Sequence, residues 1–306
     1  MTSHAHPEDQ PHPGPDAGDQ LPGGTGATEA APGLLDGPAA RAERIEAVGL
    51  HAFVTGLSAE ARRGLGMSAT RLGGAEVLAL ADDPTHYWSK ALGFGVTEPV
   101  TPELITEVVR FYERSGAQQA TIQIAPAALP EDWPAIAGEL GLEQRPSWVK
   151  LQRDLAAAPA GLPAPTAGLR VAPVAEADLA AWARVLFSGF GMPPAYDSMG
   201  TGVDPTVCHR WAAWDGDRIV AGATVVIDGD AAGMFGAATL PGDRRRGAQS
   251  ALLAARLYDA AGAGVRWVSA ETGAEAAGQR NPSLHNLRRA GLVDLYERPN
   301  WLWRAR

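Results

Sequence analysis

The pattern of hydrophobic and polar residues in the first half of the chain alternates between strand and helix signals. Residues 76–80 form an almost wholly apolar run that predicts a strand, and residues 121–124 predict another. Between them, Thr101 and Pro102 suit the N-cap and first position of a helix, and apolar residues then recur at helical spacing. Residues 130–140 predict a second helix.

The second half of the chain gives a stronger pattern. Residues 177–187 predict an amphipathic helix. Three strands follow, at 208–214, 218–227 and 232–240, joined by two Asp-Gly turns. Such turns are typical of β-hairpins, so these strands are expected to be antiparallel. A long helix is predicted at 247–261.

The C-terminal part completes a mixed architecture. A buried strand is predicted at 265–269, a shorter helix opens at Asn281-Pro282, and strands are predicted around 294–296 and 301–303. The fold class predicted is therefore α+β, with mostly antiparallel mixed sheets flanked by helices.

Two low-complexity segments divide the chain. Residues 1–44 are predicted to form a disordered tail, because this Pro-, Gly- and acid-rich segment holds few large apolar residues. Residues 156–168 consist almost entirely of Ala, Pro and Gly and predict a linker. The two predicted lobes are then 45–155 and 169–306.

Composition restricts the class of protein. With 45% hydrophobic residues among 306, the chain is neither wholly disordered nor collagen-like. No stretch reaches the ~18–20 uninterrupted apolar residues of a membrane span, so no membrane partner is expected. The single cysteine, Cys208, cannot form an intramolecular disulfide or a multi-cysteine metal site, and no metal is expected. The N-terminus lacks the pattern of a secretory signal, which predicts a cytoplasmic protein.

The charge is unevenly distributed. The formal net charge is −9, and residues 1–40 contribute six acidic and no basic side chains. Residues 169–306 carry 15 basic and 14 acidic side chains and are almost neutral. The acidic total argues against a general nucleic-acid binder.

One segment combines a strand end, an arginine-rich turn and a helix start. It runs from 240 to 253 and contains three consecutive arginines, 244–246, followed by Gly247. Free backbone N–H groups at a helix start bind anions, and a glycine there lets the backbone approach a phosphate. The segment matches neither the P-loop nor the Rossmann fingerprint. It predicts a site for a diphosphate group.

Residues 241–253 resemble the acyl-CoA signature of the GNAT acyltransferase family, Arg/Gln-x-x-Gly-x-Gly/Ala, with Arg244 first and Gly247 at the first glycine. The resemblance covers roughly 169–306, while Gln249 departs from the second Gly/Ala. The first lobe looks like a degenerate copy that lacks the signature. The resemblance thus implies a tandem of two GNAT-like lobes, and dimerisation of the chain is left open.

This resemblance implies that acetyl-CoA, or another acyl-CoA, is the co-substrate. Strand 234–240 is expected to splay from strand 267–270, with a bulge or close approach at Gly236, and the pantetheine arm would enter the gap. The residues implied to hold the co-substrate are Ala238, Thr239, Leu240, Arg244, Arg245, Arg246, Gly247, Ala248, Gln249, Ser250 and Asn286.

The residues for proton transfer are less well marked. Glu271 follows a buried strand beside the expected gap and is the candidate general base, the alternative being an exposed loop carboxylate. The family's usual tyrosine acid would fall at Leu287. Ser283, His285, Tyr296 or water would have to replace it.

The function predicted is N-acetyl transfer to the amine of a small molecule by direct attack on the thioester. The alternative is a non-catalytic acyl-CoA-binding sensor or scaffold, which Leu287 and Gln249 keep open.

His86-Tyr87-Trp88 is interpreted as aromatic packing at a helix start. A further aromatic group, Phe190, Tyr196, Trp211, Trp214 and Phe235, is left unassigned between core and acceptor pocket.

Overall fold

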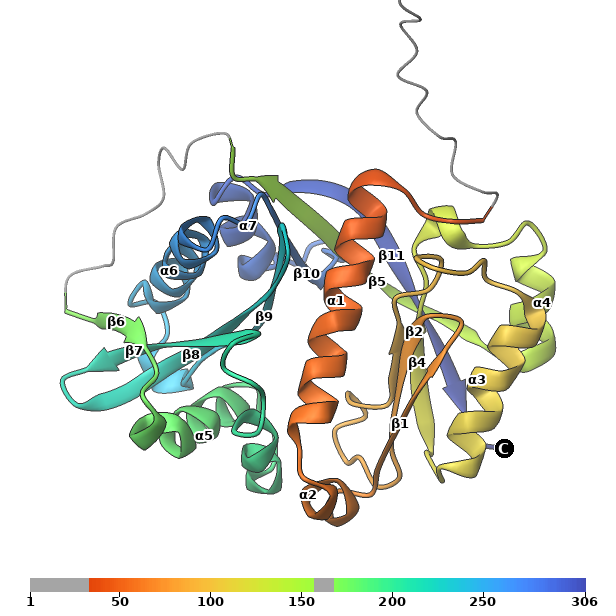
Figure 1. Ribbon diagram of the computed structural model, residues 1–306, viewed down its shortest axis with the longest axis horizontal. Helices are drawn as coiled ribbons and strands as arrows, with labels where there is room; N and C mark the ends of the chain where they lie inside the picture. The colour runs from red at the N-terminus through yellow and green to blue at the C-terminus, as the bar shows by residue number, and fades with distance from the viewer. Residues whose placement is uncertain (1–32, 157–167) are drawn as a thin grey trace, which may run out of the picture.

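One mixed sheet of eleven strands runs through the computed structural model, which describes residues 33–156 and 168–306 (Figure 1). The strand order is β1-β2-β3-β4-β11-β5-β10-β9-β8-β7-β6. The α+β class is confirmed, and the sheets of the two halves are joined edge to edge. Residues 1–32 of the predicted tail and 157–167 of the predicted linker lie outside the described residues.

The first half contributes the elements on the right of Figure 1 and the long strand β5. They are α1 (Gly37–Gly56), α2 (Ala59–Gly64), β1 (Met67–Leu72), β2 (Ala75–Leu80), β3 (Lys90–Leu92), α3 (Pro102–Arg114), β4 (Gln119–Gln123), α4 (Trp133–Leu140) and β5 (Glu143–Asp154).

The second half follows a similar plan. Its elements are β6 (Arg170–Pro173), α5 (Leu179–Gly189), β7 (Cys208–Asp215), β8 (Arg218–Asp228), β9 (Ala231–Thr239), α6 (Ala248–Gly262), β10 (Trp267–Gly273), α7 (Pro282–Arg289) and β11 (Val293–Arg304). Three antiparallel strands in the first half and four in the second lead into a parallel pair joined by a helix, β3-α3-β4 and β9-α6-β10. A last helix and a long last strand complete each half.

The two last strands are exchanged between the halves. Strand β5 pairs with β10 of the second half, and β11 pairs with β4 of the first half, both in antiparallel register. The two strands also pair with each other and so join the sheets. A residue of the first half can therefore lie inside the site of the second.

Helices cover both faces of the second half of the sheet. Val225 of β8 packs with Leu253 and Leu257 of α6. Its neighbour Val226 packs with Ile45 of α1. Because successive strand residues point to opposite faces, α6 and α1 lie on opposite sides of the sheet. Figure 1 shows α5 and α1 on the side opposite α6.

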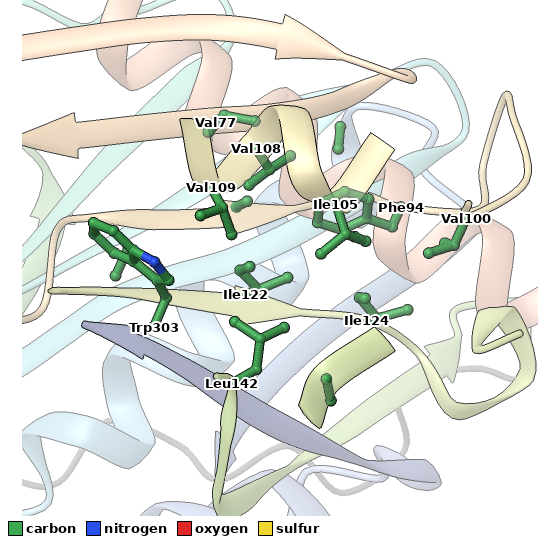
Figure 2. Packing of buried hydrophobic residues seen from close by; sticks show 14 of the residues in the cluster. Val77, Phe94, Val100, Ile105, Val108, Val109, Ile122, Ile124, Leu142 and Trp303 are labelled. Carbon is green, nitrogen blue, oxygen red and sulfur yellow. The ribbon is translucent and has the colours of Figure 1, made fainter. Parts of the chain in front are cut away.

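In the first half the core is closed around α3. Ile105, Val108 and Val109 of this helix pack with Val77 of β2 and Ile122 of β4, as Figure 2 shows. Phe94 and Ile124 lie in the same cluster, beyond the ends of β3 and β4. The place that corresponds to the gap after β9 and β10 is thus filled by apolar side chains.

The predicted strands and helices of the second half are confirmed with small shifts at their ends, and the two last strands form the single strand β11. Two predictions were wrong. Residues 37–44, assigned to the tail, are helical, because Ala42 and Glu43 are buried against the rest of the molecule and extend α1. His86-Tyr87-Trp88 lies in the β2–β3 loop and begins no helix; His86 has a positive φ of 54°.

Candidate functional site

Strands β9 and β10 separate halfway along their length. Their parallel pairing ends at Met234 and Ala270, although both strands continue for several residues. On the other edge of β9 the register with β8 shifts near Gly236, which has a φ of +40°. This bulge turns the strand away from its neighbour. The expected splay and the expected irregularity at Gly236 are both present.

A buried arginine supports the bulge. Arg256 of α6 is 3% exposed, and its Nη1 donates to the carbonyls of Thr224 (3.0 Å) and Phe235 (3.3 Å). The Thr224 hydroxyl also donates to the Phe235 carbonyl, at 3.0 Å. Burial lowers the pKa of Arg256 to about 10. This residue was not among those predicted; the sequence marks it only as an arginine at an apolar position of the helix, beside Leu253 and Leu257.

The start of α6 is open to an anion. Its N-cap is Gly247, with a φ of +79° and no side-chain cap. The backbone N–H groups of residues 245–250 donate to no carbonyl or side chain elsewhere in the described chain. In contrast, Thr101 caps α3 in the first half by accepting from Leu104 N, and an acidic Glu103 follows. Free N–H groups and a positive helix end favour an anion at α6 and not at α3.

The three arginines before α6 have different surroundings. Arg246 lies 2.7 Å from Asp215 and 3.1 Å from Asp243 and fixes the turn. Arg244 donates to the carbonyls of Thr239 and Gly189. Arg245 is exposed, with a φ of +64°, and forms no hydrogen bond or ion pair with the described residues. Of the three, Arg245 is therefore the one available to a phosphate group without loss of other contacts.

Side chains of α6 and α7 meet beside the gap. Asn286 donates to Gln249 Oε1 at 2.6 Å, and Gln249 donates to the Ser283 hydroxyl at 2.9 Å. Gln249, at the position of the second small residue, thus links the two helices. The Leu240 N–H donates to the Val220 carbonyl, so the N–H of Thr239 next to it points to the opposite edge, toward the gap.

A cavity of about 900 Å³ passes through the gap between the two faces of the sheet. On the α6 and α7 side it is lined by Gln249, Ser283, Asn286 and Leu287. On the other side its lining comes from α1, the β2–β3 loop, α5 and the residues that follow α5. The first half therefore forms much of the wall opposite the predicted co-substrate site.

A cluster of buried charges closes the cavity near the end of the β9–β10 pairing. Lys150 Nζ lies 3.0 Å from Glu271 Oε2 and also binds Glu46. The Arg298 guanidinium contacts Glu43 at 2.6 Å, Glu46 at 2.8 Å and Glu271. Glu46 and Glu271 line the cavity, while the other three are almost wholly buried.

The two carboxyls of the cluster that line the cavity, Glu271 and Glu46, have different pKa values. Burial raises the pKa of Glu271 to about 7; the Glu46 carboxylate adds to the rise, whereas Arg298 and Lys150 oppose it. For Glu46, burial also raises the pKa, but Arg298 and Lys150 outweigh it and hold the pKa well below its usual range. One carboxyl is thus ionised near neutral pH while its neighbour titrates there.

The predicted catalytic residues occupy three different environments. Glu271 lies in the cavity wall with 14% of its side chain exposed, and it is not a loop carboxylate. The Tyr296 hydroxyl donates to Glu43 at 2.7 Å and does not line the cavity; burial and the Glu43 charge raise its pKa. His285 lies 3.0 Å from Glu275 at the surface, outside the cavity lining. Ser283 and Leu287 do line the cavity.

Four residues around Glu271 were not foreseen. Glu43 and Glu46 come from the helix partly assigned to the tail, and Lys150 and Arg298 come from the exchanged strands. Lys150 gave the only sequence signal, as a lone lysine between apolar residues of a predicted strand. Of the unassigned aromatic residues, Phe190 and Phe235 line the cavity.

Two features are absent from residues 33–156 and 168–306. No helix there combines the length and the apolar character that crossing a membrane requires. Among the same residues no group of three or more His, Cys, Asp or Glu side chains could hold a metal ion.

Several solved structures share this fold. The chain is similar to a GCN5-related N-acetyltransferase from Kribbella flavida, with 16% identity and a TM-score of 0.59 over 89% of this chain and 97% of that one. It is also similar to a GCN5-related N-acetyltransferase from Sphaerobacter thermophilus, with 18% identity and a TM-score of 0.54 over 89% of this chain and 94% of that one. A tandem GNAT protein from the clavulanic acid biosynthesis pathway has 16% identity and a TM-score of 0.53 over 86% of this chain and 96% of that one.

No protein-family model and no curated protein matches the sequence. The structural similarity nevertheless spans both halves of the chain. The chain therefore has the GNAT fold in a tandem arrangement.

Proposed function

We propose that the chain is an acyl-CoA-dependent N-acyltransferase that transfers an acetyl group from acetyl-CoA to the amine of a small molecule. The observation that carries the proposal is the position of Glu271. This carboxyl, with a pKa of about 7, lines a cavity that also opens, through the gap between β9 and β10, to the uncapped start of α6. The GNAT fold supports the same class of reaction.

The residues around the gap suit an acyl-CoA. The free N–H groups of residues 245–250 and the Arg245 guanidinium would hold the diphosphate. Gln249 and Asn286 line the cavity where the pantetheine arm would pass. The Thr239 N–H, which points toward the gap, could donate to the thioester carbonyl or to the arm. Bound there, acetyl-CoA supplies an activated acyl group.

Glu271 would accept the proton that the acceptor amine must lose. With all three glutamates ionised, the cluster of Glu43, Glu46, Glu271, Lys150 and Arg298 carries one net negative charge. When Glu271 takes up a proton, the net charge of the cluster becomes zero. Burial favours this neutral state over a charged one. A base with a pKa near the working pH is effective in both directions of proton transfer.

The leaving thiolate needs a proton from another group. Leu287 occupies the position of the family's usual tyrosine and lines the cavity, so no acid is present there. Ser283 lies one turn earlier on α7 and also lines the cavity. We assign proton delivery to water, either directly or relayed through the Ser283 hydroxyl, which gives up its own proton and takes one from that water.

The apolar side chain of Leu287 also favours a second candidate, a sensor that binds acyl-CoA without turning it over. Two measurements distinguish the candidates. Calorimetric titration with acetyl-CoA tests binding, and the absence of saturable binding would exclude both. Thiol release with a panel of amines then identifies an enzyme.

Glu271→Gln tests the assigned base. The variant is expected to lose about 10²–10⁴-fold in kcat while its acetyl-CoA affinity changes less than about threefold. Glu275→Gln, which changes a surface carboxyl outside the cavity, is the matched control. An unchanged rate in Glu271→Gln would remove Glu271 as the base.

A further inference from the structure

The cavity wall on the α1 side is dominated by aromatic rings. Six of them define what we call the aromatic chamber: Phe53, Tyr87, Trp88, Trp148, Phe187 and Phe190. They come from α1, the β2–β3 loop, β5, α5 and the residue after α5. The chamber is thus built by both halves, on the face of the sheet opposite the predicted co-substrate site.

Contacts within the chain hold three of the rings together and fix the loop that carries Trp88. Phe53 and Trp88 stack with their centroids 5.0 Å apart and their planes within 5° of parallel, and Trp88 lies 6.1 Å from Phe187. Asp83 fixes the loop by accepting from the Trp88 backbone N–H at 2.7 Å. Asp83 also accepts from the Tyr196 hydroxyl at 3.1 Å, which ties the loop to the segment after α5. These contacts hold Phe53, Trp88 and Phe187 against one another.

Acidic and basic side chains line different parts of the cavity wall. The carboxyls of Glu46 and Glu271 belong to the charge cluster at one end. Two cations line other parts of the wall: Lys90, whose Nζ lies 3.6 Å above the Tyr87 ring, and Arg210, whose guanidinium donates to the Val203 carbonyl. Arg256 lies at the bulge and is held by backbone carbonyls. A ligand with a second positive charge would meet these cations.

We infer that the acceptor is a primary amine carried on an aromatic or similarly flat apolar body, with no second positive charge. This rests on the proposed function. The amine lies at Glu46 and Glu271, where its proton is removed, and the body packs among the rings of the aromatic chamber. A long acyl chain is a poorer occupant, because an uncharged chain does not compensate the one net negative charge that the cluster carries when Glu271 is ionised.

A comparison of three amines tests the inference: phenethylamine, propylamine and spermidine. Calorimetry measures their binding to the full chain without an acyl donor, and thiol release with acetyl-CoA gives their KM. Phenethylamine is expected to bind at least about tenfold more tightly than propylamine, since ring burial and stacking add to the same amine contact. Spermidine is expected to bind no better than propylamine.

Variants locate the preference in the chamber. Trp88→Leu and Phe53→Leu are each expected to reduce the preference for phenethylamine over propylamine at least about threefold, with acetyl-CoA affinity retained. Phe111→Leu is the matched control, because that ring packs on the core of the first half. Retained acetyl-CoA affinity shows that a variant is folded.

The outcomes separate this inference from the proposed function. Transfer that prefers spermidine or propylamine would overturn the inference and leave the proposed function intact. Competition between decanoyl-CoA and phenethylamine, with no transfer to phenethylamine, would assign the chamber to an acyl chain and overturn it as well. Absence of acetyl-CoA binding would overturn the proposed function, while phenethylamine binding would still test the chamber directly.

Discussion

Glu271 of β10 and Lys150 of β5 stand directly opposite each other in the sheet, with Lys150 Nζ 3.0 Å from Glu271 Oε2. The lysine belongs to the first half of the chain, whose last strand is inserted next to β10. The open helix start belongs to the second half. Because the strands are exchanged, the proposed base Glu271 depends on a charge from the first half. In that half the start of α3 is capped by Thr101 and is not open to an anion.

The Lys150 charge should set the pH range of activity. Lys150 and Arg298 lower the pKa of Glu271 against the larger effect of burial, so removal of the lysine charge in Lys150→Met raises that pKa above about 7. We expect the acidic limb of the kcat/KM profile to move to higher pH, with a several-fold loss at pH 7 and a smaller loss at pH 9. Profiles measured from pH 6 to 9 check this.

A matched control removes a charge from an exposed ion pair. Arg304 lies 2.7 Å from Glu143 at the surface, and Arg304→Met should leave the profile where it is. If the Lys150→Met profile coincided with that of the wild type, Lys150 would have no electrostatic effect on the catalytic group.

Stability should also depend on the Glu271 carboxyl. Its pKa is near 4.5 in the unfolded chain and about 7 in the folded one, so the folded state binds more protons between these values. The contribution of this group to stability therefore falls as pH rises from about 4.5 to 7 and stays low above it. Glu271→Gln removes this loss and leaves two glutamates against Lys150 and Arg298.

We expect the free energy of unfolding of Glu271→Gln, relative to the wild type, to be higher at pH 8 than at pH 5. Urea unfolding of both proteins at the two pH values measures the difference. A difference that is independent of pH would mean that Glu271 titrates in the folded chain much as it does in the unfolded one. Glu143→Gln, which changes a carboxyl of a surface pair outside the cluster, serves as control.

The contact between α1 and the segment after α5 depends on glycine. A Cβ on Gly56 would lie 2.5 Å from the Gly202 carbonyl oxygen and 2.7 Å from Val203 Cα. Gly56→Ala must displace backbone and is expected to cost about 1–3 kcal/mol in unfolding free energy. Gly64→Ala, also at a helix end but with no atom within 4 Å of the added Cβ, should be neutral or slightly stabilising. Equal stabilities of the two variants would contradict this packing.

The second half could be predicted well from the sequence because its signals are local. Asp-Gly turns mark the β7–β8 and β8–β9 hairpins, and the apolar spacing of α6 follows directly after Gly247. The gap between β9 and β10 was expected only through the resemblance to a family. Glu271 was placed at the end of a strand, and the structure puts it in the cavity wall.

The missed features depend on contacts that are distant in sequence. Glu43 meets Arg298 across 255 residues, and Lys150 meets Glu46 across 104, so no local pattern marks either pair. The start of α1 was predicted to belong to the tail because residues 1–44 are rich in Pro, Gly and acidic side chains and hold few large apolar residues. The exchange of β5 and β11 could not be predicted either. The hydrophobic pattern of a strand does not indicate which of two sheet edges the strand pairs with.

The last prediction concerns the loop before α6, where two glycines five residues apart have different requirements. Gly247 has a φ of +79° and caps the helix, whereas Gly242 has ordinary backbone angles and no atom within 4 Å of an added Cβ. Gly247→Ala strains the backbone and should turn free N–H groups away from the diphosphate, which would raise the Kd for acetyl-CoA about tenfold or more. Gly242→Ala should leave the Kd within about twofold. Calorimetric titration of both variants checks this, and equal Kd values would mean that the start of α6 does not hold the diphosphate.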